Sequence, residues 1–277
     1  MTRSDLTFVQ LSDTHIVAKG ATYIGFDTAR YLQDAIEAAN ALDPAFVVVT
    51  GDLCHTGRIA EYEHFAELFA ASRAPYFVVP GNHDSVKRLR EVLPPAAFGG
   101  AGREAFSYAV DVGGLRLVAL DSTVPRAVNG GFDAARLDWL AATLAAAPSQ
   151  ATAIALHQPP FRTGMNLVDR FPYRGVKRLR EIVLANPQVA LVLGGHVHCV
   201  RAARWNGTLA VTAPSTSPQR VPELFERSLV GIRKERPGFI VHRRRADGYF
   251  ESTVYRRDEP WGPFKPTERA RNRVTAP

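Results

Sequence analysis

The chain has 277 residues, of which 46% are hydrophobic and 22% charged, and its formal net charge is +7. This composition is typical of a soluble globular protein and excludes disorder, collagen-like repeats and coiled coil as descriptions of the whole chain. No apolar run reaches the ~18 residues of a membrane helix, and the N-terminus lacks the apolar core of a secretory signal. With two cysteines only, we expect no disulfide framework. From these features together we expect no membrane contact and a cytoplasmic protein.

Strand-like and helix-like segments alternate along the first 200 residues. The predicted strands are short apolar runs at residues 8–11, 46–49, 76–79, 115–120, 154–156 and 190–193. The predicted helices show apolar residues at helical spacing over residues 28–42, 61–72 and 134–147. Alternation of this kind predicts βαβ units, and continuous apolar runs predict strands buried on both faces. The fold class is therefore α/β, with a sheet sandwiched by helices.

The pattern changes after residue 198. Strand-like segments with short connections follow at residues 200–205, 209–212, 239–242 and 249–255, and we expect antiparallel pairing among them. Residues 213–237 and 257–277 are rich in Pro, Ser and charge and are interpreted as loop and tail. We divide the chain into a core, residues 1–212, and a C-terminal extension, residues 213–277, that completes the same domain as a cap or dimer contact.

The positive charge is concentrated at the C-terminal end. Residues 201–277 contain 16 Lys and Arg against 8 Asp and Glu, whereas residues 1–200 contain 18 against 19. Such a surface could attract phosphate-bearing ligands or nucleic acid, but a solvated face and a frayed tail are the favoured explanation.

Polar residues that bind metals follow five of the predicted strands directly. They are Asp13-Thr14-His15, Gly51-Asp52, Gly81-Asn82-His83-Asp84, His157, and Gly195-His196-Val197-His198. In open α/β sheets ligands bind outside the carboxyl ends of the strands, so these side chains are expected to converge on one crevice. Each motif alone is weak evidence, because turns and helix caps use the same residues. Their recurrence after strand upon strand is strong evidence that they form one metal site.

The donor set indicates the kind of metal. Carboxylates, imidazoles and one amide, without a thiolate, suit Mn, Fe, Zn or Co rather than a structural cysteine site. About seven ligands are more than one ion takes, so two ions that share a carboxylate fit better.

These motifs, in this order, resemble the signature of the calcineurin-like metallophosphoesterase superfamily over roughly residues 7–212. The sequences around Ser12-Asp13, Thr50-Gly51-Asp52, Pro80-Gly81-Asn82 and His157-Gln158-Pro159-Pro160 are most similar to the bacterial class III cyclic nucleotide phosphodiesterases, a group that includes glycerophosphodiesterase-like members. The resemblance implies a four-layer α-β-β-α sandwich of mixed sheets flanked by helices, with a small C-terminal extension.

The resemblance also implies roles for eight residues. Asp13, His15 and His198 hold the first divalent ion, Asn82, His157 and His196 hold the second, and Asp52 bridges the two. A hydroxide that bridges the ions attacks phosphorus in line. His83 is not a ligand but acts on the substrate phosphate, so the catalytic set is His83, Asp52 and Asn82. Fe or Mn is favoured, with Zn or Co as alternatives.

Four residues depart from the family pattern. Gln158 stands where the family often has a second His, and Pro218 stands where some relatives have a His, so both departures bear on substrate rather than on metal binding. Cys54 and His55 follow Asp52, where the family usually has an aliphatic or polar turn. For His55, as for His64 and His242, a solvent-exposed or core role is expected, and Cys54 and Cys199 are interpreted as small buried residues.

The resemblance predicts a binuclear phosphodiesterase acting on small diesters, with 3′,5′-cyclic nucleotides such as cAMP favoured. A glycerophosphodiesterase or a broad phosphomono- and diesterase is the nearest alternative. A nuclease is less favoured, because no nucleic-acid module is recognised. A catalytically silent scaffold conflicts with the complete ligand set. The expected partners are a small phosphodiester and a second copy of the chain in a homodimer.

Overall fold

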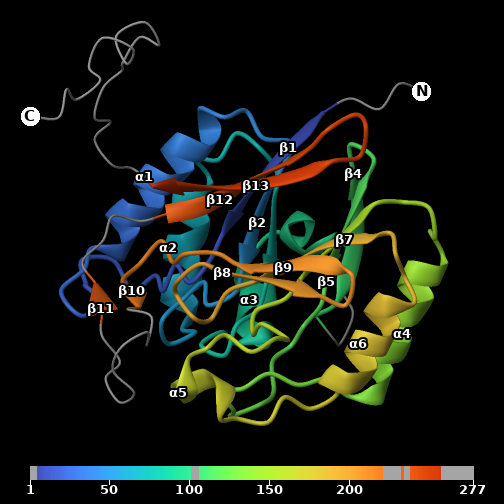
Figure 1. The fold of residues 1–277 in the computed structure, drawn as a ribbon. Coiled ribbons are helices and arrows are strands. Elements are labelled where there is room, and N and C mark those ends of the chain that lie inside the picture. The colour runs from blue at the N-terminus through green and yellow to red at the C-terminus, as the bar shows by residue number, and fades with distance from the viewer. Residues whose placement is uncertain (1–4, 101–105, 221–231, 234–237, 257–277) are drawn as a thin grey trace, which may run out of the picture.

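The structure is a computed structural model that describes residues 5–100, 106–220, 232–233 and 238–256 (Figure 1). Its helices are α1 (Thr28–Asn40), α2 (Ile59–Phe69), α3 (Val86–Val92), η1 (Pro95–Phe98), α4 (Ala134–Ala145), α5 (Asn166–Asp169) and α6 (Val176–Leu184). Asp27 and Asp133 begin α1 and α4, since their carboxylates accept hydrogen bonds from backbone N–H groups of the first turn.

The strands fall into two large sheets and one short pair. The first sheet has the order β13-β12-β1-β2-β3 and the second the order β4-β5-β6-β7-β9-β8. The strands of the first sheet are β1 (Leu6–Leu11), β2 (Val47–Thr50), β3 (Tyr76–Val79), β12 (Gly238–Arg244) and β13 (Phe250–Arg256). Those of the second are β4 (Tyr108–Val112), β5 (Leu115–Ala119), β6 (Thr152–Ala155), β7 (Val189–Gly194), β8 (Arg201–Trp205) and β9 (Thr208–Thr212).

Both sheets are parallel at the centre and antiparallel at the edges. β1, β2 and β3 are parallel neighbours, as are β5, β6, β7 and β9. The pairs β12–β1, β12–β13, β4–β5 and β8–β9 are antiparallel. The parallel strands end at the same edge of each sheet, and this places the polar residues that follow them together.

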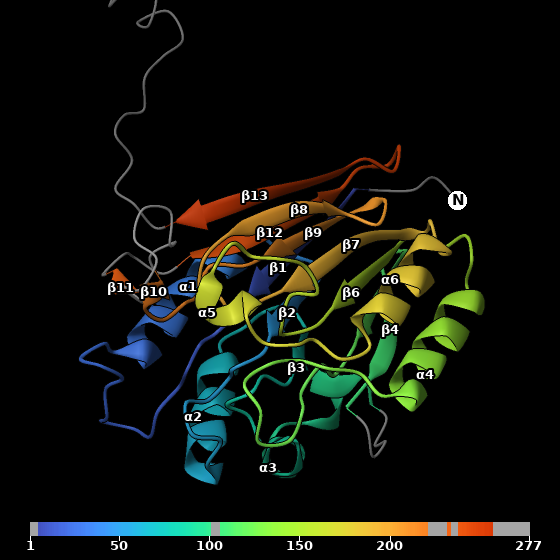
Figure 2. The same cartoon turned by 60° about the horizontal axis from the view of Figure 1, so that its bottom comes forward.

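Alternating side chains of the second sheet separate two layers of core. Leu117 and Ala119 of β5 belong to the buried cluster that contains the first sheet, α1 and α2. Val118, one position along the same strand, belongs to a second cluster with Leu137 of α4 and Leu179 of α6. The sheets therefore pack on each other through one face, and helices cover their outer faces, as Figure 2 shows. This arrangement confirms the predicted fold class of two mixed sheets flanked by helices.

The predicted strands and helices of the core are all present, with ends shifted by a few residues. Five further elements of residues 1–212 have no counterpart among the predictions: the helices α3, η1, α5 and α6 and the edge strand β4. The expected antiparallel pairing after residue 198 is correct for β8–β9 and β12–β13, but β9 also lies parallel to β7.

The C-terminal segment differs in part from the expected loop. The short strands β10 (Gln219–Arg220) and β11 (Ile232–Arg233) pair within it. β12 inserts beside β1, so residues beyond the proposed boundary at 212 belong to the first sheet; the boundary itself stays a prediction. The predicted tail, residues 257–277, lies outside the described residues. Among the described helices, none has the length and apolar character needed to cross a bilayer.

Candidate metal centre

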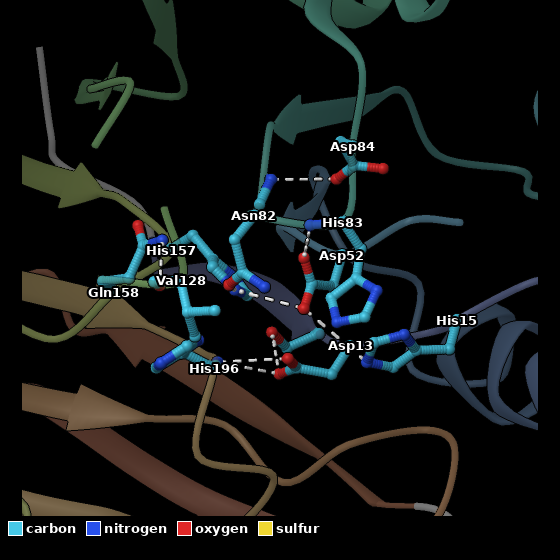
Figure 3. Close-up of polar contacts among 12 residues, drawn as sticks. Asp13, His15, Asp52, Asn82, His83, Asp84, Val128, His157, Gln158 and His196 are labelled. Atoms are coloured by element: carbon cyan, nitrogen blue, oxygen red, sulfur yellow. Dashed lines mark hydrogen bonds and ion pairs between the residues drawn. The ribbon is translucent and has the colours of Figure 1, made fainter. Parts of the chain in front are cut away.

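The structure brings together all eight residues that the sequence motifs singled out, as Figure 3 shows for most of them. The first sheet supplies those that follow β1, β2 and β3, and the second sheet supplies those that follow β6 and β7. The residues are Asp13, His15, Asp52, Asn82, His83, His157, His196 and His198. Convergence of distant strand ends is therefore confirmed.

The backbone bends sharply where these side chains leave the strands. Asp13, His15, Asp52, His196 and His198 all have positive φ angles, between 43° and 73°. This left-handed region is uncommon for residues other than Gly, and such conformations persist where the surrounding structure imposes them. The tight turns aim the side chains back over the sheet edges instead of along them.

Four of the residues form a compact set of donors. One ligand atom from each of Asp13, His15, Asp52 and His198 lies within 4.8 Å of the others, and all four side chains are buried. His15 Nε2 is 3.1 Å from His198 Nε2, and His198 Nε2 is 3.4 Å from Asp13 Oδ1. Two imidazole nitrogens and two carboxylates that converge in this way form a site for a cation.

Asp52 lies between this set and a second one. Its Oδ2 is 3.6 Å from His15 Nε2 and 3.4 Å from His157 Nε2, while its Oδ1 accepts a hydrogen bond from the backbone N–H of His83 at 2.9 Å. A β-carbon added at Gly81 would lie 2.2 Å from Asp52 Oδ1, so only glycine permits this approach. A single carboxylate thus faces histidines from both sides.

The second set contains Asn82, His157 and His196. Asn82 Oδ1 lies 3.2 Å from His157 Nε2, and the rings of His157 and His196 meet edge to face with centroids 5.2 Å apart. The backbone N–H of His196 donates to both carboxylate oxygens of Asp13 at 3.1 Å, which ties this set to the first.

Backbone carbonyls orient the histidine rings. His157 Nδ1 donates to the carbonyl of Thr50 at 2.8 Å, and His198 Nδ1 donates to that of Pro218 at 2.9 Å. Because a carbonyl only accepts, each Nδ1 carries a proton, and Nε2 is the nitrogen that faces the cluster. This outer hydrogen bond is the usual support of a metal-binding imidazole.

Burial and charge determine which groups are ionised. Burial lowers the pKa of His15, His196 and His198, so these rings stay neutral. Burial would raise the pKa of Asp52, but His157 and other neighbouring histidines outweigh it and hold that pKa well below its usual range. Burial likewise opposes protonation of His157, yet the Asp52 charge raises its pKa to about 9. The three neutral imidazoles and the ionised carboxylate fit divalent cations of the Mn, Fe, Co and Zn group, and a cation that binds at His157 would displace its Nε2 proton.

His83 lies beside the cluster with a different environment. Its ring meets that of His15 edge to face with centroids 4.8 Å apart, and its Nδ1 donates to the carbonyl of His55 at 2.7 Å. The side chain is only half-buried, unlike those of His15 and Asp52. His83 therefore presents Nε2 at the rim, where a substrate atom can reach it.

His55 is a site residue that the sequence interpretation missed. Its ring stacks on that of His83 with centroids 5.4 Å apart, and its centroid lies 4.1 Å from that of the Tyr23 ring. Donor atoms of His15, His55 and His83 lie within 4.8 Å of one another. We expected an exposed or core role for His55, but the structure places it at the rim of the candidate centre. Its position three residues after Asp52 was the available signal.

Asp84 orients the turn that carries Asn82 and His83. Its carboxylate accepts hydrogen bonds from the backbone N–H groups of Leu53, Cys54 and Gly81 at 2.8–3.2 Å and from the Tyr62 hydroxyl at 3.1 Å. Burial raises its pKa to about 6. The residue that precedes α3 is Ser85, so helix capping does not explain Asp84.

The departures from the family pattern have structural explanations. Gln158 is buried, its Oε1 accepts from the Ser122 hydroxyl at 2.6 Å, and its Nε2 donates to the Val128 carbonyl at 3.2 Å. Pro218 supplies the carbonyl that orients His198. Cys54 and Cys199 are free and buried, in agreement with a packing role.

Comparison with known proteins places this geometry in context. Residues 6–200 match the protein family described as calcineurin-like phosphoesterase. The 3′,5′-cyclic adenosine monophosphate phosphodiesterase CpdA of Escherichia coli (strain K12) is 32% identical over 252 residues, which cover 90% of this chain and 88% of that protein. The probable glycerophosphodiester phosphodiesterase GpdQ of Arcobacter nitrofigilis is 30% identical over 238 residues, or 84% of this chain and 87% of that protein.

A solved structure shows the same fold at lower sequence similarity. A dimetal phosphatase from Danio rerio aligns with a TM-score of 0.61 and 16% identity, and the alignment covers 91% of this chain and 99% of that one. This likeness shows the fold alone.

Proposed function

This chain belongs to the calcineurin-like phosphoesterase family and is a metal-dependent phosphodiester hydrolase, and on that premise we propose that its substrates are small phosphodiesters, above all 3′,5′-cyclic nucleotides such as cAMP. The observation that carries the proposal is the position of Asp52, whose Oδ2 lies 3.6 Å from one set of histidines and 3.4 Å from the other. The relative CpdA, similar over 90% of this chain, supports the choice of substrate.

We assign the donors to two divalent ions. Asp13, His15 and His198 would hold one ion, Asn82, His157 and His196 would hold the other, and Asp52 would serve both. Fe and Mn are the proposed metals, with Zn or Co as alternatives, because the donor set suits all four. When bound, such ions act as Lewis acids toward a phosphoryl oxygen and lower the pKa of water.

The protein's own groups complete the reaction. The His83 ring donates from Nδ1 to the His55 carbonyl, so when the ring is protonated on both nitrogens its Nε2–H can donate to the substrate phosphate or protonate the leaving oxygen. Asp84 and the backbone N–H of His83 fix the turn, so that this ring and Asp52 keep their relative positions. The chain thus positions and protonates, in addition to holding the ions.

A second candidate substrate class is supported by a specific relative. The GpdQ protein of Arcobacter nitrofigilis is named a probable glycerophosphodiester phosphodiesterase, and it is similar over 84% of this chain. Glycerophosphodiesters use the same metal chemistry and differ in the groups attached to phosphorus. A nuclease has less support, and a silent scaffold has least, because every candidate ligand is present.

The test is a substrate panel. Purified protein loaded with Mn²⁺ is assayed against cAMP, glycerophosphoethanolamine, bis-p-nitrophenyl phosphate, p-nitrophenyl phosphate and single-stranded DNA, with and without a chelator. We expect hydrolysis of cAMP and of bis-p-nitrophenyl phosphate that the chelator abolishes. Preference for glycerophosphoethanolamine over cAMP would transfer the proposal to the second class, and cleavage of DNA alone would overturn both.

A further inference from the structure

A pocket of about 180 Å³ opens beside the candidate metal centre. It shares His196 with the centre, and its remaining walls come from the turn at Asn129–Gly130 and from residues 158–176. Figure 3 places Gln158, which lines the pocket, and Val128, which precedes the lining residue Asn129, on the side of His157 and His196, opposite His15. A molecule whose phosphate lies at the metal centre can therefore extend into the pocket.

The inner wall of the pocket is fixed before any ligand binds. The Tyr173 hydroxyl donates to the backbone carbonyl of Gln158 at 3.0 Å, and the Gln158 side chain bonds to Ser122 and Val128. A β-carbon at Gly130 would lie 2.8 Å from the Tyr173 ring, so glycine lets that ring close against the turn. A preformed wall lowers the ordering cost of binding.

The lining combines aromatic and apolar side chains with a few polar ones, among them Arg162 and Asp169. Phe161, Phe171, Tyr173 and Pro160 line the pocket. Phe171 is 42% exposed although it is a large hydrophobic residue, and the Arg170 guanidinium lies 5.0 Å from its ring centroid. Flat rings of this kind provide surfaces on which planar bases stack, whereas glycerol or ethanolamine has no face to stack on.

We propose that this pocket is the subsite for the nucleobase of the substrate, with Phe161 and Phe171 as its stacking residues. This inference rests on the proposed function and deepens it, since it assigns the preference for a cyclic nucleotide over a glycerophosphodiester to a defined part of the molecule. The phosphate lies at the metal centre, the ribose spans His196, and the base enters between the turn at Asn129–Gly130 and the aromatic side chains.

The experiment compares substrates with and without a base. Phe171→Ala and Phe161→Ala, loaded with Mn²⁺, are assayed with cAMP and with glycerophosphoethanolamine. The matched control is Tyr249→Ala, which removes an aromatic ring that is 63% exposed in the β12–β13 hairpin. We expect the KM for cAMP to rise about 5- to 150-fold in the pocket variants, with kcat and the KM for glycerophosphoethanolamine unchanged. Phe171→Leu, which keeps an apolar side chain but no ring, should lose the same preference.

Binding of AMP separates this inference from the proposed function. Calorimetric titration of AMP into the Mn²⁺-loaded protein needs no turnover, so it tests the pocket even if cAMP is not hydrolysed. Weaker AMP binding by both pocket variants, with Tyr249→Ala at the wild-type value, supports the subsite. Equal AMP affinity in all four proteins, or an equal loss of activity on both substrates, would overturn it. Failure of the wild type to hydrolyse cAMP would overturn the proposed substrate instead.

Discussion

The two sheets contribute different chemistry to one site. The first sheet supplies every carboxylate and the amide of the candidate centre, through Asp13, Asp52 and Asn82, whereas the second supplies imidazoles only, through His157, His196 and His198. Neither sheet alone holds enough donors for two ions. Formation of the site therefore depends on the packing of one sheet against the other.

Polar contacts tie the sheets together next to the site. Gln10 of β1 donates from Nε2 to the carbonyl of Gly194 in β7 at 2.8 Å, and its Oε1 lies 3.1 Å from His242 Nε2 in β12. His242 Nδ1 is 2.8 Å from the Ser252 hydroxyl in β13. A buried polar chain thus crosses the first sheet and reaches the second. Substitutions at the shared carboxylate, at the rim or in this row of polar side chains test what each sheet contributes.

The largest effect is expected from Asp52→Ala, because Asp52 faces donors of both sheets. Even an outer-shell partner of a metal ligand typically accounts for about 10- to 100-fold in affinity or activity, so loss of the shared carboxylate should lower kcat by on the order of 10³-fold or more. Metal content, measured by mass spectrometry, should fall with it. Asp111→Asn, at an exposed position of β4, is the control. Two ions retained by Asp52→Ala would contradict the bridging role.

The next effect is expected at the rim. His83→Ala removes a first-sheet imidazole that is not assigned to a metal, so the protein should keep both ions while turnover falls about 10²- to 10⁴-fold, the range for general acid–base groups. Steady-state kinetics and metal analysis on the same samples measure both quantities. A fully metallated variant with wild-type kcat would exclude His83 from the reaction.

The row of polar side chains formed by Gln10, His242 and Ser252 predicts that the stability of the protein depends on pH. Burial lowers the pKa of His242 to about 3, whereas an unfolded imidazole titrates near ~6.5. As the pH falls below that value, the unfolded chain takes up a proton that the folded protein refuses. The folded state should therefore lose on the order of 3 kcal/mol between pH 7 and pH 4 through this residue.

His242→Gln should flatten this part of the pH profile, as measured by urea denaturation at several pH values. His64→Gln, on α2, retains the buried His242 and should keep the wild-type slope. An unchanged slope in His242→Gln would show that the proton uptake on unfolding occurs elsewhere.

The smallest effect concerns the turn where the sheets meet. A β-carbon at Gly195 would lie 2.2 Å from Ser12 Oγ and 2.9 Å from Asp13 Oδ2, whereas one at Gly194 would meet nothing closer than 3.5 Å. Gly195→Ala should therefore lose about 1–3 kcal/mol of unfolding free energy, as overpacked cores do, together with metal affinity. Gly194→Ala is the adjacent control and should resemble the wild type. Equal stability of the two variants would contradict the close approach.

The core of the fold and the ligands were predictable for one reason. Apolar runs such as Phe46–Val49 end at Gly51-Asp52, and a parallel sheet brings such ends to one edge. The pattern thus determined both the strands and the position of their polar neighbours. The helix α6 was also accessible, because Leu179, Ile182 and Val183 have helical spacing and are buried.

Other features depend on contacts between segments distant in the sequence. β12 pairs with β1 across more than 200 residues, and no local pattern specifies that neighbour. The place of His55 at the rim depends on the turn after Asp52, and the pocket depends on the approach of Tyr173 to Gly130. Propensity and periodicity describe single elements, so they do not report such tertiary contacts.

The five positive φ angles at the candidate centre have a consequence for how the site is loaded. Such conformations cost on the order of 1–3 kcal/mol each, and hydrogen bonds between the packed sheets, such as the one from the His196 backbone N–H to Asp13, hold them. The cage is consequently built in advance, and an incoming ion has little protein to rearrange. We therefore expect exchange of one ion for another to leave the fold unaltered, so that the supply of metals in the cell decides which of them the protein carries.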